Sequence, residues 1–426
     1  MEILKAKKIF FCGIGGIGIS ALARVINENG ISVFGSELKK TNLTTEMEGE
    51  NIKIIYKQTE ENISPDFDFF IYTTAIPENH PELKKAKELK IPTLSYAQAL
   101  GKLSENFKLI QISGTHGKST TTAMIAKILL ENDLDPTIII GTLMKELGNK
   151  NFRKGNSNIM IIEGCEYKDA FLNYTPQILA LTKIEPDHLD YFKTEENYYE
   201  SFKKMAEKVP ENGFIVYDNA DKNTYDLIKD SKAKKVAWEN KNIAPKVPGK
   251  FNIENASLAL KVAEILNIEE KSRVRSIKEF SGTWRRMEIK DTNLKGPVFI
   301  DDYGHHPTEI TLTLKAIREQ NPNKKILCIF QPHQYSRTKS YLNEFAKSFE
   351  DVDQVIITEI YESRDSDEDK KAISGEILNL EINKKTGNSK FIKTIPEVAD
   401  YLKNNTKWDV IITMGAGNIN EIYDLI

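Results

Sequence analysis

The feature that most constrains the fold is a pattern that occurs twice: a short apolar run, a glycine-containing turn and a segment with helical apolar spacing. The first copy joins residues 9–11 to residues 19–26, and the second joins residues 109–112 to residues 120–130. Each copy is typical of a strand, a phosphate-binding turn and a helix in a parallel α/β sheet. Because the copies lie about a hundred residues apart, we expect them in two separate domains.

A third block of alternating strands and helices begins near residue 297. It starts with the apolar run 298–300 and a helical pattern from about 308 to 319, and further strand-like runs follow at 326–330, 355–357 and 410–412. A length of 426 residues also favours two or three domains. The sequence therefore predicts an α/β fold with three domains, at residues 1–105, 106–293 and 294–426.

Composition and charge narrow the class of protein. The chain has 40% hydrophobic and 28% charged residues and a net charge of −3, which is typical of a soluble globular protein and argues against a nucleic-acid partner. A lysine-rich start precedes an apolar run, but the glycines at 13–18 and Arg24 interrupt it, so we expect neither a signal peptide nor a membrane segment. Cys12, Cys165 and Cys328 show no zinc or redox spacing. We expect a cytoplasmic protein with no membrane partner, as a monomer or weak homodimer.

The turn at residues 13–18 matches the pattern G-x-G-x-x-G. Glycines let the backbone approach a pyrophosphate, whose charge is favoured by the helix N-terminus. Glu37, at the end of the next predicted strand, is placed to accept a ribose hydroxyl. On its own this pattern is compatible with NAD, with another dinucleotide-like ligand, or with a tight turn that binds nothing.

The second turn gives a more specific signal. Gly114 and Gly117 free backbone amides to surround phosphate oxygens. Lys118 can neutralise the β- and γ-phosphates, and Ser119 can ligate Mg²⁺. Ile112 stands where the usual P-loop has its first glycine, and a chance Gly-Lys-Ser tripeptide is common, but this one lies between an apolar strand and a helix. We predict a P-loop-type central ATPase domain, with ATP and Mg²⁺ as cofactors, between a Rossmann-like N-terminal domain and a Rossmann-like C-terminal domain.

Carboxylates and a histidine follow two of the predicted strands of the central domain. One apolar run ends at Glu163, and another ends at Glu185, Asp187 and His188. Ligands of open α/β sheets gather at such strand ends, and Mg²⁺ prefers oxygen ligands. We expect Glu163 and His188 to contact metal or phosphate and leave Glu185 and Asp187 open. The alternative is that these carboxylates cap the following helices.

Histidines and a pair of arginines supply further candidates. An ordinary surface or core position suits His80, whereas the other five histidines lie in or beside polar strand-end segments, at positions 116, 188, 305, 306 and 333. Arg285 and Arg286 place two cations near a predicted domain junction. The planar fork of arginine suits phosphate. A salt bridge between domains is the alternative for one of the two arginines.

With these residues in place, the chain closely resembles the Mur ligases over nearly its whole length. The turn at 13–18 is similar to the family's UDP-binding turn, and residues 114–120 are similar to its ATP loop. Further similar segments follow in the family's order, at residues 184–190, 249–256, 285–288, 301–309, 330–333 and 414–419. The segments at 301–309 and 330–333 are the most specific, and they resemble the branch that adds a single L-alanine.

The resemblance implies a ligase that joins L-alanine to the carboxylate of UDP-N-acetylmuramate through an acyl phosphate, in peptidoglycan precursor synthesis. It implies catalytic roles for Lys118, His188, Arg286, His305 and His306. It implies ATP contacts for Gly114, Thr115, His116, Gly117, Lys118, Ser119, Thr120, Asn252, Asn255, Arg285 and Asp302. Substrate contacts are implied for Gly15, Gly16, Ile17, Gly18, Ser36, Glu37, Thr74, Tyr303, His333 and Arg337, and magnesium ligation for Ser119, Glu163 and His188.

Two departures from the family pattern affect these expectations. The acidic segment that usually reads E-A-D-E-x-D reads E-G-C-E-Y-K at residues 163–168, with the first glutamate retained. The alanine-adding branch typically carries F-Q-P-H-R-Y-[ST]-R, and here Gln334 replaces the first arginine while Arg337 remains. Since these arginines are implied to hold the amino-acid carboxylate, the amino acid is less determined than the reaction class. The sequence also does not choose between Lys203 and Lys204 as a counterpart of the carbamylated lysine of other Mur ligases.

The resemblance also bears on how the reaction would proceed. ATP contacts in the central domain and amino-acid contacts in the third predict that domain closure assembles the site. His305 or His306 is a candidate for taking the amine proton or orienting the substrate.

Three alternatives to this function remain. They are a sibling ligase that adds a peptide or a different amino acid, an NAD-dependent oxidoreductase, which only the first glycine turn suggests, and a non-enzymatic nucleotide-binding regulator.

Overall fold

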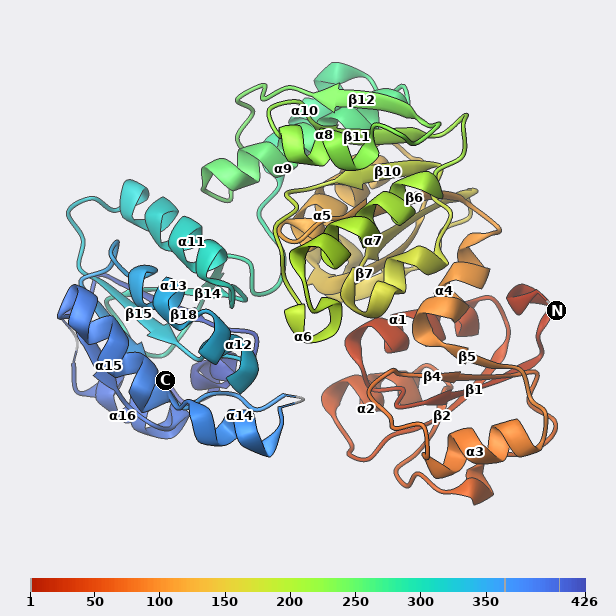
Figure 1. Cartoon of the computed structure of the whole chain (residues 1–426), viewed down its shortest axis with the longest axis horizontal. Coiled ribbons are helices and arrows are strands. Elements are labelled where there is room, and N and C mark those ends of the chain that lie inside the picture. The colour runs from red at the N-terminus through yellow and green to blue at the C-terminus, as the bar shows by residue number, and fades with distance from the viewer. Residues whose placement is uncertain (1, 364, 406) are drawn as a thin grey trace. The chain divides into compact units, whose positions relative to one another are not determined.

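The computed structural model describes residues 2–363, 365–405 and 407–426. It divides into two compact units, the first made of Met1–Ile243 and Glu254–Phe280 and the second of Ala244–Ile253 and Ser281–Ile426 (Figure 1). Three sheets, each largely or wholly parallel, confirm the predicted three-domain α/β fold class. The domain boundaries near residues 105 and 293 stay predictions. Within the described residues no helix has the length and hydropathy to cross a bilayer; the cellular location and the oligomeric state stay predictions.

The first sheet forms the Rossmann-like half of the first unit. Its strand order is β3-β2-β1-β4-β5, and all neighbouring strands are parallel. The strands are β1 Lys8–Cys12, β2 Ser32–Ser36, β3 Lys53–Ile55, β4 Phe69–Tyr72 and β5 Thr93–Ser95. The helices are α1 Ile17–Glu28, α2 Asn42–Gly49, α3 Pro81–Glu88 and α4 Tyr96–Ser104, with short 3₁₀ segments η1 Ile3–Lys5 and η2 Glu60–Asn62. The strand order reverses at β1, so the glycine turn after β1 lies at the switch point where α/β sheets bind ligands.

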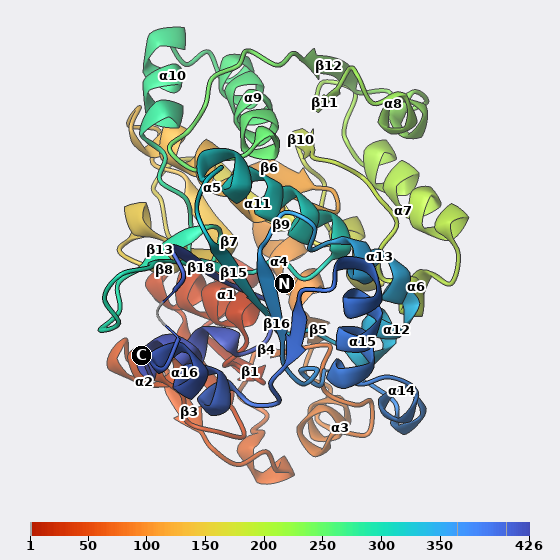
Figure 2. The same cartoon turned by 90° about the vertical axis from the view of Figure 1, so that its left-hand side faces the viewer.

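The second sheet has seven strands in the order β12-β11-β10-β6-β9-β7-β8. They are β6 Lys108–Ser113, β7 Thr137–Met144, β8 Lys150–Arg153, β9 Ile159–Gly164, β10 Ile178–Leu181, β11 Phe214–Asp218 and β12 Lys234–Trp238. Only the edge pair β7–β8 is antiparallel among the described strands of this sheet. Its helices are α5 Lys118–Leu130, α6 Leu189–Phe192, α7 Glu195–Glu207, α8 Lys222–Ile228, α9 Lys250–Ile265 and α10 Glu270–Glu279, with η3 Lys145–Leu147 and η4 Tyr167–Asn173. Figures 1 and 2 both place β11, β12, α8 and α10 at the end of this unit away from the first sheet.

The third sheet forms the second unit, in the order β13-β14-β18-β15-β16-β17. Its strands are β13 Glu288–Lys290, β14 Val298–Asp302, β15 Ile326–Phe330, β16 Gln354–Ile357, β17 Ser389–Phe391 and β18 Val410–Met414. Its helices are α11 Pro307–Gln320, α12 Tyr335–Ser340, α13 Leu342–Lys347, α14 Asp367–Ala372, α15 Gly375–Thr386 and α16 Ile395–Lys403, with η5 Ile419–Asp424. Strand β13 pairs antiparallel with β14, so the third sheet begins before residue 293.

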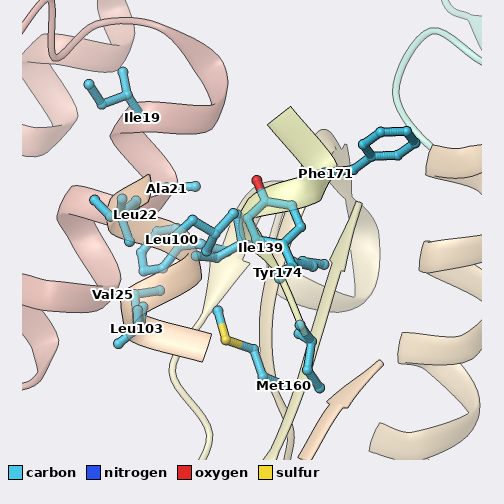
Figure 3. Close-up of a cluster of buried hydrophobic side chains, with 14 of the residues drawn as sticks. Ile19, Ala21, Leu22, Val25, Leu100, Leu103, Ile139, Met160, Phe171 and Tyr174 are labelled. Carbon is cyan, nitrogen blue, oxygen red and sulfur yellow. The ribbon is translucent and has the colours of Figure 1, made fainter. Parts of the chain in front are cut away.

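The first two sheets share one hydrophobic core through α1 and α4. Ile19, Leu22 and Val25 of α1 are buried in the same cluster as Ile139 of β7 and Met160 of β9. Figure 3 shows Leu22, Val25, Ile139 and Met160 between the two helices and the strands of the second sheet. At about 1.5–3 kcal/mol for each fully buried large apolar side chain, the cluster is a major source of cohesion within this unit.

A buried arginine reinforces the same junction. Arg24 of α1 is 2% exposed, and its guanidinium binds both carboxylate oxygens of Glu50, with Nε 2.6 Å from Oε2. Its Cζ lies 4.5 Å from the ring centroid of Phe152 on β8. Lys150 of β8 reaches the same Glu50 carboxylate at 3.1 Å but is 42% exposed. The charge of Arg24 is thus neutralised at the place where the first sheet's helix packs on the second sheet.

Replacing Arg24 should destabilise the first unit strongly. In Arg24→Ala the partly buried Glu50 loses its main partner, and we expect the free energy of unfolding to fall by about 3 kcal/mol. In the matched variant Lys150→Ala the same carboxylate loses an exposed partner, and we expect a loss of about 0.5 kcal/mol. Urea unfolding followed by circular dichroism measures both. Equal effects of the two substitutions would contradict the assignment of Arg24 as the main ionic contact of this junction.

Candidate functional site

The predicted phosphate loop connects β6 to α5 in the first unit. Gly117 precedes the helix at φ 84°, a left-handed conformation that favours glycine. A Cβ atom at this position would lie 2.4 Å from Oδ1 of Asn255 on α9. The loop and α9 are therefore so close at this point that a side chain at position 117 would clash with Asn255. Thr120, the remaining residue of the expected ATP loop, is buried in the first turn of α5.

Lys118 is held inside this loop by an acidic partner that the sequence did not single out. Its ammonium lies 3.0 Å from Oε2 of Glu166, which is 2% exposed, and donates to the carbonyls of Gly114 and Thr115. Burial alone would lower the pKa of Lys118, but the Glu166 carboxylate outweighs burial and raises that pKa above its ordinary value. The loop therefore carries a full positive charge at neutral pH.

Glu163 and Ser119 face each other at the start of α5. The Ser119 hydroxyl donates to Oε2 of Glu163 at 3.0 Å, and the Gly141 amide of β7 donates to Oε1 at 2.8 Å. Glu163 is the second-last residue of strand β9, at the strand end as expected, and its two partners lie on helix α5 and strand β7. In the structure this carboxylate therefore contacts the first turn of α5 and strand β7.

Three ligand-type side chains meet beside the loop. Glu166, Asp187 and His188 each offer an atom within 4.8 Å of the others. His188 precedes α6 at φ 54°, its Nε2 lies 3.8 Å from Oε1 of Glu166, and its backbone amide donates to Asp187. Two carboxylates and the nearby Glu163 supply the oxygen ligands that Mg²⁺ prefers, so the residues present fit a nucleotide-bound magnesium ion.

His116 and Thr115 tie the loop to the segment after β10. The His116 Nε2 lies 3.2 Å from Glu185, and Lys183 contacts the same carboxylate at 2.5 Å. The hydrogen bond from His116 and the charge of Lys183 lower the pKa of Glu185 to about 2. The Thr115 hydroxyl donates to the Glu185 carbonyl at 2.6 Å and accepts from the Glu185 amide. Glu185, which the sequence left open, is thus a structural partner of the loop.

The carboxylate of Glu37 binds the glycine turn that follows β1. The amide of Gly15 donates to Oε2 of Glu37 at 2.9 Å, so Glu37 occupies the position that would face a ligand on this turn. Gly16 ends the turn and Ile17 begins α1, while a Cβ on Gly18 would lie 3.0 Å from Tyr96. Further members of the expected substrate contacts are placed differently: Thr74 is exposed in the loop after β4, and Ser36 is fully buried with its hydroxyl donating to Glu82.

The two adjacent arginines have different surroundings in the second unit. Arg285 is 2% exposed, and its guanidinium bonds Asp301 at 2.8 Å and the carbonyls of Gly415 and Gly417. All three nitrogens of this guanidinium are engaged inside the unit, so its expected ATP contact rests on the family resemblance alone. Arg286 is more exposed, and its guanidinium lies over the Tyr303 ring, 5.2 Å from the centroid.

Asp302 is a buried carboxylate at the end of β14. It accepts hydrogen bonds from the Gly304 amide at 2.8 Å and from the Met287 amide at 2.9 Å. Burial raises the pKa of Asp302 to about 6, although the charge of Arg286 opposes this shift. The expected ATP contact of Asp302 stays a prediction, and the structure shows it holding two backbone turns together.

The histidines after β14 have separate bonding patterns. His306 caps α11, because its Nδ1 accepts from the Thr308 amide at 3.3 Å. His305 places Nδ1 3.1 Å from the Tyr303 carbonyl and 3.6 Å from Glu309. A carbonyl can only accept, so this bond places the Nδ1 proton on His305. Glu309 also completes the capping box with His306 and lies 3.9 Å from Arg286.

The segment after β15 carries the remaining candidates. His333 stacks on Tyr361, with ring centroids 5.7 Å apart and an interplanar angle of 12°. Gln334 adopts φ 68° ahead of α12, and its side-chain amide donates to the Ser363 carbonyl at 3.0 Å. Arg337 is buried within α12. Asn252, in the same unit, donates to the Pro248 carbonyl at 2.7 Å.

Two acidic residues contact expected site residues without being candidates from the sequence, Glu166 in the first unit and Glu309 in the second. Glu166 lies in the segment that departs from the family pattern, and the retained E-x-x-E spacing with Glu163 was the available signal. Glu309 stands three residues after His306, which is the spacing of a capping box. In both cases the partner, Lys118 or Arg286, is distant in sequence, so a local pattern could not show the ion pair.

Family models match all three sheets of the chain. The Mur ligase family catalytic domain matches residues 8–108, the Mur ligase middle domain matches residues 112–238, and the Mur ligase glutamate ligase domain matches residues 285–417. These segments contain the first glycine turn, the phosphate loop and the histidine segment after β14, respectively.

Individual relatives are similar along their whole length. UDP-N-acetylmuramate–L-alanine ligase of Clostridium kluyveri is 38% identical over 455 residues, covering 100% of this chain and 98% of the relative. The enzyme of the same name from Caldanaerobacter subterraneus subsp. tengcongensis is 38% identical, covering 99% and 97%. The crystal structure of UDP-N-acetylmuramate–alanine ligase from Thermotoga maritima matches with a TM-score of 0.79 and 26% identity, covering 98% and 97%. A murein peptide ligase from Psychrobacter arcticus, at 20% identity and a TM-score of 0.71 over 98% of this chain and 97% of that one, shares the fold.

The raised pKa of Asp302 predicts a pH-dependent stability of the second unit. Between about pH 4 and 6 the folded carboxyl keeps a proton that the unfolded chain has lost, so stability should fall by about 2 kcal/mol as the pH rises through this window. Above about pH 7, where the folded carboxyl has lost its proton as well, this contribution is constant. Asp302→Asn should remove this slope, even though the amide loses one of the two backbone contacts.

The pH dependence is measurable by urea unfolding at pH 4 to 7, followed through the fluorescence of Trp284 and Trp408 in a Trp238→Phe background. The exposed Asp400 serves as a matched control, and Asp400→Asn should leave the slope unchanged. An identical slope with and without the Asp302 carboxyl would show that other groups carry it.

Proposed function

The chain belongs to the Mur ligase family, and on that premise we propose that it joins L-alanine to the carboxylate of UDP-N-acetylmuramate and cleaves ATP to ADP and phosphate. The observation that carries this proposal is the 38% identity, over the whole chain, to a relative that bears the name of this reaction. It is supported by the site of the first unit, where Lys118 and Ser119 of the phosphate loop contact Glu166 and Glu163, respectively.

The loop suits the transfer of a phosphoryl group from ATP to a carboxylate. Such a transfer depends on positioning and on neutralising negative charge. Lys118 supplies a charge that Glu166 and the loop carbonyls hold in place. The N-terminus of α5 directs its amides toward the same loop, and this arrangement favours phosphate oxygens.

We propose that Ser119, Glu163 and His188 hold Mg²⁺ when nucleotide is bound, with Glu166 and Asp187 beside them. The cation would neutralise the phosphate oxygens. The protein residues orient one another: Ser119 donates to Glu163, and the His188 amide donates to Asp187. Ser119 follows β6, and the other groups lie at or beyond the ends of β9 and β10, the two strands that flank β6.

The substrate carboxylate attacks the γ-phosphorus and forms an acyl phosphate with release of ADP. The amine of L-alanine then attacks the acyl carbon, and phosphate leaves as the amide bond forms. An amine proton has to be removed in this second step. Of the two adjacent histidines, His305 is the better base, because its Nδ1 proton faces the Tyr303 carbonyl and Nε2 can accept. His306 uses its Nδ1 to cap α11.

Replacing Lys118 should abolish most of the ligase activity. We expect Lys118→Ala to lower kcat for alanine-dependent ADP release by about 10²- to 10³-fold, because a positioned cation on the transferring phosphate is removed. Lys271→Ala, an exposed lysine on α10, is the matched control and should be unchanged. A coupled assay of ADP release with UDP-N-acetylmuramate measures both variants. Near-normal turnover of Lys118→Ala would contradict the proposed role of the loop.

The amino acid is tested by a phosphate-release screen of UDP-N-acetylmuramate with each amino acid and with the tripeptide that sibling ligases use. We expect L-alanine to exceed glycine in kcat/KM by roughly 10- to 200-fold, the range for one methyl group in an apolar pocket. If position 334 tunes binding of the amino acid, Gln334→Arg should change the KM for L-alanine and leave the KM for ATP unchanged. Preference for the tripeptide would replace the proposed function by that of the sibling ligase.

A further inference from the structure

A second cluster of ligand-type side chains lies at the first sheet, apart from the phosphate loop of the second sheet. Cys12 ends β1, His80 precedes α3 and Glu82 lies in the first turn of α3. All three are buried, at 0%, 8% and 0% exposure. One ligand atom from each lies within 4.8 Å of the others. From the sequence we expect only an ordinary surface or core position for His80.

The hydrogen bonds around His80 fix which ring nitrogen faces the cluster. Nε2 of Gln58 donates to the Ser36 hydroxyl at 3.3 Å, so Oε1 of Gln58 is its acceptor end. That oxygen lies 3.2 Å from Nε2 of His80, which therefore carries the ring proton. Nδ1 is left with its lone pair, and it lies 3.8 Å from Sγ of Cys12.

The carboxylate of Glu82 is oriented in the same way. The Ser36 hydroxyl donates to Oε2 at 2.7 Å, and the Asn62 side-chain amide donates to Oε1 at 2.7 Å. Gln58 and Asn62 are only half-buried, so they lie between the cluster and solvent. A histidine whose outer nitrogen is held by a hydrogen bond and a carboxylate held by donors are the usual surroundings of metal ligands.

We propose that Cys12, His80 and Glu82 bind a thiophilic divalent cation of the zinc class. Sulfur, imidazole nitrogen and carboxylate oxygen together suit Zn²⁺, whereas Mg²⁺ and Ca²⁺ prefer oxygen alone. The lack of zinc spacing among the cysteines does not bear on such a site, since it uses one cysteine, and His80 lies 68 residues beyond it. The cation has to displace the thiol proton when it binds.

The position of the site suggests what the cation would do. Cys12 immediately precedes Gly13 of the glycine turn, and Ser36, which bonds Glu82, immediately precedes Glu37. A cation at this point would link the ends of β1 and β2 to α3 directly behind the turn. The inference is tested apart from the ligase activity, because metal binding is measured without substrate or nucleotide.

Cobalt provides the direct probe, because Co²⁺ replaces Zn²⁺ and a cobalt–thiolate bond gives a near-ultraviolet charge-transfer absorption. The full-length protein, stripped of metal with a chelator, is titrated with Co²⁺ in the absence of nucleotide. We expect a saturable thiolate band that added Zn²⁺ abolishes. Cys12→Ser should remove the band, whereas Cys328→Ser should keep it. Cys165→Ser should also keep it, and this control matters because Cys165 is exposed and next to Glu166.

A milder variant separates metal binding from a loss of folding. Gln58→Ala keeps all three ligands but releases the His80 ring, and we expect it to weaken Zn²⁺ binding by about 10- to 100-fold in competition with a chelating indicator. Circular dichroism verifies that each variant is folded. The proposal is overturned if the unaltered protein shows no thiolate band, if the band depends on Cys165, or if folded Gln58→Ala binds Zn²⁺ as tightly as the parent.

Discussion

The charge of Lys118, partly buried against the fully buried Glu166, is the constraint on which the site of the first unit depends. A buried ammonium is costly unless a partner and hydrogen-bond acceptors compensate it. Glu166 and the carbonyls of Gly114 and Thr115 fill this requirement. The strand order β10-β6-β9 brings them together, because the carboxyl ends of three adjacent parallel strands share one edge. Glu166, which lies beside the proposed magnesium ligands, therefore also holds the lysine in its loop.

In the third sheet a second cation, Arg285, is compensated in the same way. Arg285 is buried against Asp301 at the end of β14 and against the carbonyls that follow β18, the neighbouring strand. This ion pair fixes the backbone from which Arg286 and Tyr303 project. The adjacent arginines thus divide two tasks: Arg285 supports the unit's core, and Arg286 presents a cation at its more exposed side.

Sequence patterns predicted the features that are local. The two glycine turns, the strands that lead into them and the position of Glu163 at a strand end follow from short apolar runs and turn residues. Pairings between distant residues did not follow, because the direction of a side chain is set by packing. Glu166 stands in a segment that departs from the family motif, so its ion pair with Lys118 is not evident from the sequence. The sequence around His80 likewise does not indicate that Cys12 and Glu82 lie beside it.

The hydrophobic core shared by α1, α4 and the second sheet limits how this protein can be divided. A fragment that ends near residue 105 would carry Leu22, Val25 and Leu103 without the strands that cover them. Such an uncovered apolar face favours aggregation over independent folding. Gene fusions, truncations and crystallisation fragments of this chain therefore have to keep the first two sheets as one piece, although each sheet carries its own glycine turn.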